Sequence, residues 1–160
     1  MSTGHRIWRI ATQGPSWQAD DLSGLGAAQD PGRWNSLGVP VVYTSGSIAL
    51  ACLETLVHIS GDLSLPLQRW LVEIDIPLEH WQQRTILQPE DCSGWSACPP
   101  EPPSCAWGSQ WLASRRALLA QVPSVIIPEE ANLLINPGHP ACNLLQPTVV
   151  RRWTYDTRLI

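Results

Sequence analysis

The side chains most able to do chemistry lie close together in one stretch of the sequence, from Gly32 to His58. This stretch holds a guanidinium (Arg33), a phenol (Tyr43) and a carboxylate (Glu54). A guanidinium can make two parallel hydrogen bonds to a phosphate, and an aromatic ring can stack on a flat ligand. A carboxylate can stabilise a positive charge that develops beside it. Each of these three side chains is therefore a candidate functional residue.

The same stretch predicts the elements that position these side chains. Arg33 lies in a loop, and an apolar strand is expected over residues 39–43. Ser47 is a suitable N-cap for a helix over residues 48–59, and this helix is apolar on every side, which predicts that it is buried. Glu54 lies in its middle, where a carboxylate is costly without a partner. Glu54 is therefore either half of a structural ion pair with an arginine or a catalytic group on the floor of a pocket.

Two blocks of the sequence resemble a known family. The first consists of GRWN at residues 32–35, PVVYTS at 40–45 and ALACLETLVH at 49–58, and the second is VPSVIIPEEANLLINPGHP at 122–140. Both resemble the RES domain family, which is named for an Arg, a Glu and a Ser and supplies the toxin of bacterial toxin–antitoxin pairs. The resemblance implies one ADP-ribosyltransferase-like α+β domain over residues 1–160, with short strands in mixed or antiparallel sheets and a few helices.

The resemblance also implies a reaction and roles for four residues. Breaking the bond between nicotinamide and ribose in NAD passes through an oxocarbenium-like sugar, and the nicotinamide leaves as a neutral ring without a general acid. Glu54 would stabilise the sugar cation, Arg33 would hold the pyrophosphate, and Tyr43 would stack on or bond to the nicotinamide end. Ser124 would supply a hydroxyl near the substrate, although a serine after proline is also a common strand start. NAD enters as the substrate, so neither a cofactor nor a metal ion is expected.

Further candidate substrate-binding residues each have a structural alternative. Trp34 and Asn35 flank the loop arginine and would shape the pocket, although Trp34 suits the core equally well. His58 follows the helix carboxylate by one turn and would orient it, or would lie half-buried at the helix end. Asn136 and His139 are either pocket residues or formers of a proline-rich turn.

Arg9 is the remaining substrate-binding candidate, and it lies on a first strand expected over residues 5–11. The family also has an arginine on an early strand, and Arg9 is the better positional match to it. Alternation of the strand alone predicts instead an edge arginine in solvent, which is the interpretation we favour from the sequence.

The rest of the chain predicts short strands and helices. Strands are expected at residues 68–76, 122–127, 133–135 and 148–154, and a helical turn with a short strand is expected within 78–87. An amphipathic helix is expected over residues 107–121, with Arg115 and Arg116 facing solvent. Residues 88–106 contain five prolines and are expected to form an irregular surface loop.

Composition and charge argue against several other functions. The formal net charge of -4 argues against direct binding of nucleic acid, which needs a basic surface. No stretch approaches the ~20 apolar residues of a membrane span, and the polar N-terminal residues lack the apolar region of a signal peptide, so we expect a cytoplasmic protein. The five cysteines contain no C-x-x-C pair, which argues against a zinc or redox site. The G-x-S-x-G pattern of serine hydrolases is absent as well.

The function implied by the resemblance is that of a RES-type toxin that degrades NAD. It would cleave the nicotinamide–ribose bond by hydrolysis or phosphorolysis and arrest growth unless its antitoxin is bound. The alternatives are transfer of ADP-ribose to a protein target and a non-enzymatic interaction module. The implied partners are a cognate antitoxin with a helix-turn-helix (Xre-like) domain and, within that complex, a second copy of this chain.

Overall fold

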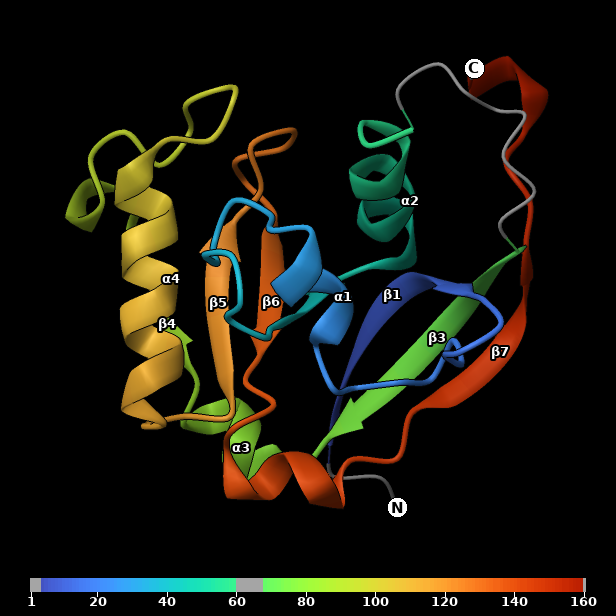
Figure 1. Cartoon of the computed structure of the whole chain (residues 1–160), viewed down its shortest axis with the longest axis horizontal. Helices are drawn as coiled ribbons and strands as arrows, with labels where there is room; N and C mark the ends of the chain where they lie inside the picture. The colour runs from blue at the N-terminus through green and yellow to red at the C-terminus, as the bar shows by residue number, and fades with distance from the viewer. Residues whose placement is uncertain (1–3, 60–67, 160) are drawn as a thin grey trace.

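A mixed sheet forms the centre of the protein, as Figure 1 shows for the computed structural model, which describes residues 4–59 and 68–159. Within those residues the sheet has seven strands: β1 (His5–Gln13), β2 (Val42–Ser45), β3 (Gln68–Ile76), β4 (Thr85–Ile86), β5 (Leu119–Pro123), β6 (Ala131–Ile135) and β7 (Thr148–Trp153). Their order across the sheet is β4-β5-β6-β2-β1-β3-β7. Strands β4 and β5 pair in parallel and the other neighbours are antiparallel. With few helices beside it, this sheet confirms the expected α+β fold.

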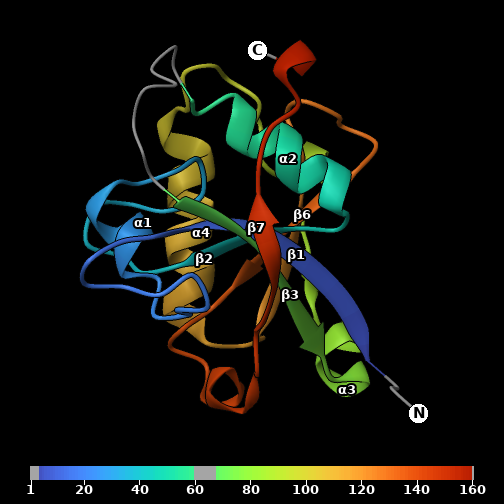
Figure 2. The ribbon, with the colours of Figure 1, turned by 90° about the vertical axis from the view of Figure 1, so that its right-hand side faces the viewer.

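The helices pack against this sheet and around its ends. They are α1 (Leu25–Gln29), α2 (Ile48–Leu56), α3 (Leu78–Gln82) and α4 (Pro102–Ser114), with short 3-10 helices at Pro89–Asp91, Pro140–Leu144 and Thr157–Leu159. In Figure 1, β5 and β6 stand between α4 and α2. Figure 2 shows β7 at the outer edge of the sheet, and the chain after it rises to α2, where the Tyr155 and Thr55 hydroxyls lie 2.6 Å apart.

One row of opposed residues shows that α2 and α4 cover the same face of the sheet. Trp8 on β1 lies opposite Ser45 on β2, Ser45 lies opposite Asn132 on β6, and Asn132 lies opposite Val122 on β5. Directly opposed residues share a face of the sheet. Trp8 packs with residues of α2, and Val122 packs with residues of α4. Ser45 and Asn132 therefore lie between the two helices.

The other face of the sheet carries a second core, and Arg9 lies on that face. Ile7 and Ala11 pack there with Leu133 and with residues before α1 and in the 3-10 helix at Pro140–Leu144. The prediction of a solvated edge arginine was wrong, because β1 lies between β2 and β3. Arg9 alternates with Trp8, its Nε is buried, and among the described residues this atom has no hydrogen-bond partner. Burial lowers the pKa of Arg9, and the nearby charge of Asp21 partly opposes this effect.

The helix predicted over residues 107–121 was wrong at both ends. Helix α4 begins at Pro102. Proline suits the first turn of a helix because the N–H group that it lacks would have no partner within the helix there. It ends at Ser114, and Arg115 takes a left-handed backbone conformation with φ 53°. The following residues form β5 because they pair with β4 and β6, and this tertiary pairing overrides their helix propensity.

The elements around Glu54 differ from the prediction in their ends and in burial. Strand β2 covers Val42–Ser45 rather than residues 39–43. Helix α2 ends at Leu56, three residues early, and only Leu50 and Ala51 within it are buried, so the expectation of burial on every side was wrong. The N-cap is confirmed, since the Ser47 hydroxyl accepts a hydrogen bond from the Leu50 amide at 3.1 Å. Strand β3 matches its prediction at both ends.

Candidate active site

The Glu54 carboxylate is held by one of its two oxygens. Asn132 Nδ2 and Ser124 Oγ both donate to Oε1, each at 2.7 Å. Ser124 follows β5 and Asn132 is the second residue of β6, so the carboxylate of α2 meets two strands that come much later in the chain. Both donors are neutral, which orients the carboxylate without cancelling its charge. No other described residue donates to Glu54, so Oε2 has no protein partner there.

The structure does not support the ion-pair alternative for Glu54. Among the described residues, ion pairs join Arg6 to Glu73 and Arg158 to Asp156 only. The carboxylate therefore keeps an uncompensated negative charge beside two neutral hydrogen bonds.

Ser124 is completely buried, with 0% of its surface exposed. Its hydroxyl oxygen accepts hydrogen bonds from the backbone amides of Ile126 (3.1 Å) and Ile127 (3.2 Å). The turn after β5 therefore anchors the hydroxyl that donates to Glu54.

Two residues beside Glu54, Asn132 and Ser45, are not singled out by any pattern in the sequence. Ser45 Oγ donates to Asn132 Oδ1 at 2.7 Å, and Asn132 in turn donates to Glu54. The available signal was a polar residue at one end of each apolar strand, which is also typical of ordinary strand ends. Asn132 lies within the second block that resembles the RES family, yet 78 residues separate it from Glu54.

Arg33 is fixed by the loop that precedes α4. Its Nη1 donates to the carbonyl oxygens of Trp95 (2.8 Å) and Ala97 (2.6 Å), and its Nη2 lies 3.4 Å from Cys98 Sγ. No carboxylate of the described residues pairs with it. The guanidinium is thus held by neutral groups and keeps a positive charge that a phosphate can neutralise.

Tyr43 ties the Arg33 loop to β2. Its hydroxyl donates to Asn35 Oδ1 at 2.6 Å and accepts from the Trp34 amide at 3.0 Å. Burial raises the pKa of Tyr43, so the phenol stays protonated. Asn35 is 1% exposed, and its amide donates to the carbonyls of Ala27 (2.8 Å) and Val39 (2.9 Å). The hydrogen bonds of Asn35 therefore serve the loop itself.

Trp34 lies in the core, at 3% exposure. Its ring lies 6.4 Å from that of Trp95, in a stacked arrangement, and 5.7 Å from that of Trp107, edge to face. A Cβ on Gly108 of α4 would collide with the Trp34 carbonyl, so helix and loop touch backbone to backbone. Arg33 is consequently held between β2 on one side and α4 on the other.

Among the described residues, none of the remaining candidates forms a hydrogen bond with Glu54. His58 is exposed beyond the end of α2. Asn136, at 2% exposure, donates to the Leu112 carbonyl at 2.9 Å, and His139 caps the 3-10 helix at Pro140–Leu144. This 3-10 helix lies at the opposite end of the sheet from α2 in Figure 1. Burial and the adjacent His80 lower the pKa of His139. Arg9 lies on the other face of the sheet.

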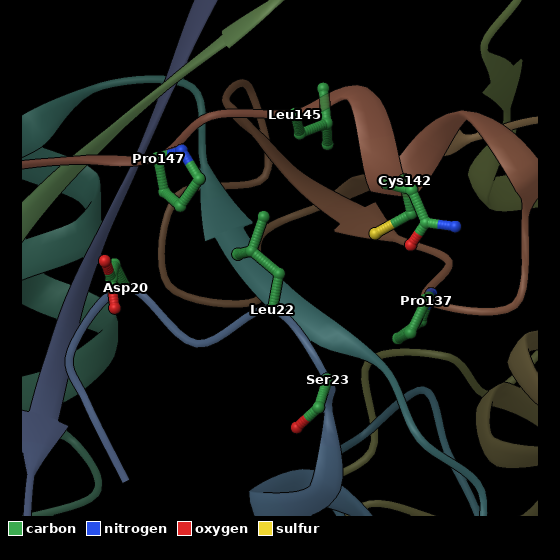
Figure 3. Close-up of a pocket in the computed structure, with 8 residues that line it drawn as sticks. Asp20, Leu22, Ser23, Pro137, Cys142, Leu145 and Pro147 are labelled. Atoms are coloured by element: carbon green, nitrogen blue, oxygen red, sulfur yellow. The ribbon is translucent and has the colours of Figure 1, made fainter.

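A hollow of about 370 Å³ opens beside the second core, away from these residues (Figure 3). Leu22 projects into the view between Pro147 and Ser23, with Cys142 and Pro137 on the other side. Among the described residues, none of the predicted site residues lines it, and neither does any arginine or glutamate. The charged groups suited to a dinucleotide therefore lie on the α2–α4 face instead.

Comparison with known proteins decides the family. Residues 6–158 match the RES domain. The chain belongs to the RES domain family. A relative from Sphingobium sp. (strain YBL2), named "Prs ADP-ribosylating toxin", is 50% identical over 155 residues, which are 96% of each chain. A "Toxin Res" from Pseudomonas putida is 38% identical over 155 residues, covering 96% of this chain and 98% of the relative.

The RES fold of this chain also resembles a solved structure. The match is to the MbcT–MbcA toxin–antitoxin complex of M. tuberculosis, with a TM-score of 0.54 and 19% identity. It covers 94% of this chain and 86% of the other. At this identity the likeness establishes the fold alone. In the part of the RES chain that the structure describes, no helix has the length and hydropathy to cross a membrane.

Proposed function

We propose that this RES protein is a toxin that consumes NAD, with Glu54 stabilising the sugar cation formed when nicotinamide leaves. One observation carries the proposal: two neutral donors hold Oε1 of Glu54, whereas Oε2 has no described partner. A fixed, uncompensated carboxylate in a partly buried place is suited to stabilising a positive charge that appears during a reaction. The loop carbonyls occupy only Nη1 of Arg33. Its other N–H groups and its positive charge would bind the pyrophosphate.

The proposed reaction has one bond-breaking step and one bond-forming step. The bond between ribose C1 and the pyridinium nitrogen breaks, its electron pair stays on the nitrogen, and nicotinamide leaves neutral. The ribosyl cation then takes an electron pair from a nucleophile, which loses a proton to solvent. Glu54 acts on the cation by charge alone, so no proton transfer by the protein is required in the first step.

A protein side chain is the acceptor that we favour. The relative that is 50% identical is named for ADP-ribosylating Prs, and it covers 96% of this chain. That name supports transfer of ADP-ribose to a protein by this chain as well. Water and phosphate are the second pair of acceptors, because the same cation forms in every case. Hydrolysis or phosphorolysis would deplete NAD directly, and each acceptor leaves a different product.

Product analysis tests the proposal and separates these acceptors. The purified protein would be incubated with NAD alone, with added phosphate, and with purified Prs, and products would be identified by mass spectrometry. Release of nicotinamide by the wild type but not by Glu54→Gln supports the reaction. ADP-ribose, its phosphorylated form or modified Prs then identifies the acceptor. If no condition releases nicotinamide, the enzyme proposal fails and the interaction-module alternative is favoured.

The partner we propose is an antitoxin with a helix-turn-helix (Xre-like) domain. The structural neighbour is a toxin solved together with an antitoxin, which supports an antitoxin as partner. The net charge of -4 leaves DNA binding to that partner rather than to this chain. A homodimer of the toxin within the complex and action in the cytoplasm complete the proposal.

A further inference from the structure

The hydrogen bonds from Ser45 through Asn132 to Glu54 allow only one direction. A carboxylate can only accept, so Asn132 must present its Nδ2 to Oε1, at 2.7 Å. This turns Oδ1 of the same amide toward Ser45. An amide oxygen also only accepts, so the Ser45 hydroxyl must donate, at 2.7 Å. Ser45 thereby fixes which end of the amide faces the carboxylate.

Ser124, the second donor to Oε1 of Glu54, is fixed in the same way. Two backbone amides, those of Ile126 and Ile127, occupy the lone pairs of its hydroxyl oxygen. Its hydrogen is then left to point at Oε1 of Glu54. Two donors of fixed direction converge on one oxygen, so rotation of the carboxylate would break both hydrogen bonds together.

Burial makes this arrangement hard to replace by solvent. Ser45 is 3% exposed and Ser124 is 0% exposed. A polar group that loses its partner in such a place is left without a hydrogen bond, which is costly. Ser124, which donates to the carboxylate, and Ser45, which holds the partly buried Asn132, therefore have no ready alternative partner in water.

We propose that Ser45 and Asn132 are positioning residues that lock the Glu54 carboxylate with Oε2 turned to the substrate. The proposal rests on the proposed function, because it assigns Oε2 to the sugar cation. Neither residue touches the substrate in this scheme. Ser45 acts through Asn132, and Asn132 acts through Glu54.

Thr44 offers a matched control on the same strand. It adjoins Ser45, is 4% exposed, and its hydroxyl donates to the Leu133 carbonyl at 2.8 Å. Its side chain points to the opposite face of the sheet because neighbours on a strand alternate. Thr44→Val thus removes a buried β2–β6 hydrogen bond of similar length without touching Glu54.

The hydrogen bonds from Ser45 through Asn132 to Glu54 form a relay. The kinetics of four variants test this relay, with nicotinamide release as the readout. Asn132→Ala should lower kcat by about 10²-fold with little change in KM, because misplacing a reacting group costs about that much. Ser45→Ala should lower kcat less, and the double variant should be no slower than Asn132→Ala alone, since Ser45 acts through Asn132. Thr44→Val should keep its kcat. Equal kcat values for Ser45→Ala and Thr44→Val would overturn the proposal, as would losses that multiply in the double variant.

Hydrogen exchange of the Asn132 side-chain amide, followed by NMR on the full chain, tests the relay without any turnover. Exchange should be slow in the wild type and in Thr44→Val, and faster in Ser45→Ala. Equal exchange in the two variants would overturn the positioning role. A wild type that releases no nicotinamide but shows slow, Ser45-dependent exchange would instead refute the proposed function and leave the relay intact.

Discussion

At the scale of single residues, the unequal use of the two Glu54 oxygens is the main feature of the site. Oε1 receives both hydrogen bonds, from Ser124 and Asn132, and Oε2 receives none from the described residues. A carboxylate with a purely structural role would be expected to share its bonds between both oxygens or to pair with a cation. In the observed pattern Oε1 orients the carboxylate and Oε2 is left available for a substrate. A conservative substitution can test this division.

Glu54→Gln should fold, bind NAD and lose turnover by about 10²-fold or more, the scale of removing a key electrostatic group. The amide oxygen of glutamine can accept both hydrogen bonds that Oε1 accepts now, and only the negative charge is removed. Nicotinamide release and an NAD titration measure the two effects separately. Glu129→Gln is the control, because Glu129 is an exposed glutamate in the turn after β5. Turnover close to wild type in Glu54→Gln would remove this carboxylate from the mechanism.

Arg33→Lys should weaken NAD binding about tenfold, which corresponds to about 1.4 kcal/mol. The guanidinium satisfies two loop carbonyls with Nη1 and still has N–H groups left for a phosphate. An ammonium is a point charge and cannot keep that geometry. Calorimetric titration with NAD measures the loss, and Arg116→Lys on the exposed surface serves as the control. Full affinity in Arg33→Lys would mean that this side chain supplies only diffuse charge.

At the scale of elements, the loop that carries Arg33 is held between a strand and a helix. Tyr43 of β2 bonds to Trp34 and Asn35 of the loop, and Gly108 lets α4 approach the Trp34 backbone. The position of the guanidinium therefore depends on the packing of two elements rather than on the loop alone.

Tyr43→Phe should destabilise the protein by about 1–3 kcal/mol, because the Trp34 amide loses its partly buried partner. Burial also raises the pKa of Tyr43. Above pH about 10 the unfolded chain releases the phenol proton while the folded chain keeps it, so the free energy of unfolding falls as pH rises. Urea unfolding at pH 7 and above pH 10 should show this decline in the wild type and a smaller one in Tyr43→Phe. An equal decline in both would exclude Tyr43 as its source.

The sequence predicts the elements with periodic patterns and misses those decided by tertiary pairing. Strand β3 alternates over its whole length and was predicted at both ends. The run of Ala and Leu after Arg115 reads as a helix, yet it becomes a central strand because β4 and β6 flank it. At the site, Glu54 could be singled out as a charge in an apolar helix. Asn132 could not, since no local pattern shows which strand end will meet a helix 78 residues earlier.

At the scale of the whole molecule, the two faces of the sheet carry different residues. The α2–α4 face holds Glu54, Arg33 and their hydrogen-bond partners, whereas the other face holds the larger core and Arg9. Asn136 and His139 belong to the far end of the sheet. We therefore expect a partner that blocks the proposed reaction to cover the region between the end of α2 and the loop before α4.

We expect the antitoxin to cover the Arg33–Glu54 region and to place a carboxylate or a peptide tail against Arg33. NAD and antitoxin should then compete, and the complex should bind NAD poorly. Substitution of Arg115 and Arg116, which are exposed at the other end of α4, should leave neutralisation intact. Titration of NAD into the purified complex and into the free protein compares the two NAD affinities. Unchanged NAD affinity in the complex would point to inhibition by distortion or blocked movement instead.

The distance along the chain between Glu54 and its donors has a consequence for synthesis on the ribosome. Ser124 lies 70 residues after Glu54 and Asn132 lies 78 residues after it. A nascent chain therefore carries the carboxylate long before either donor, or the strands that hold them, has been translated. Fragments released by early termination would lack the oriented carboxylate altogether. We therefore expect no toxic activity from the nascent chain until translation has passed the start of β6. An antitoxin made during the earlier part of synthesis would be present before the toxin can act.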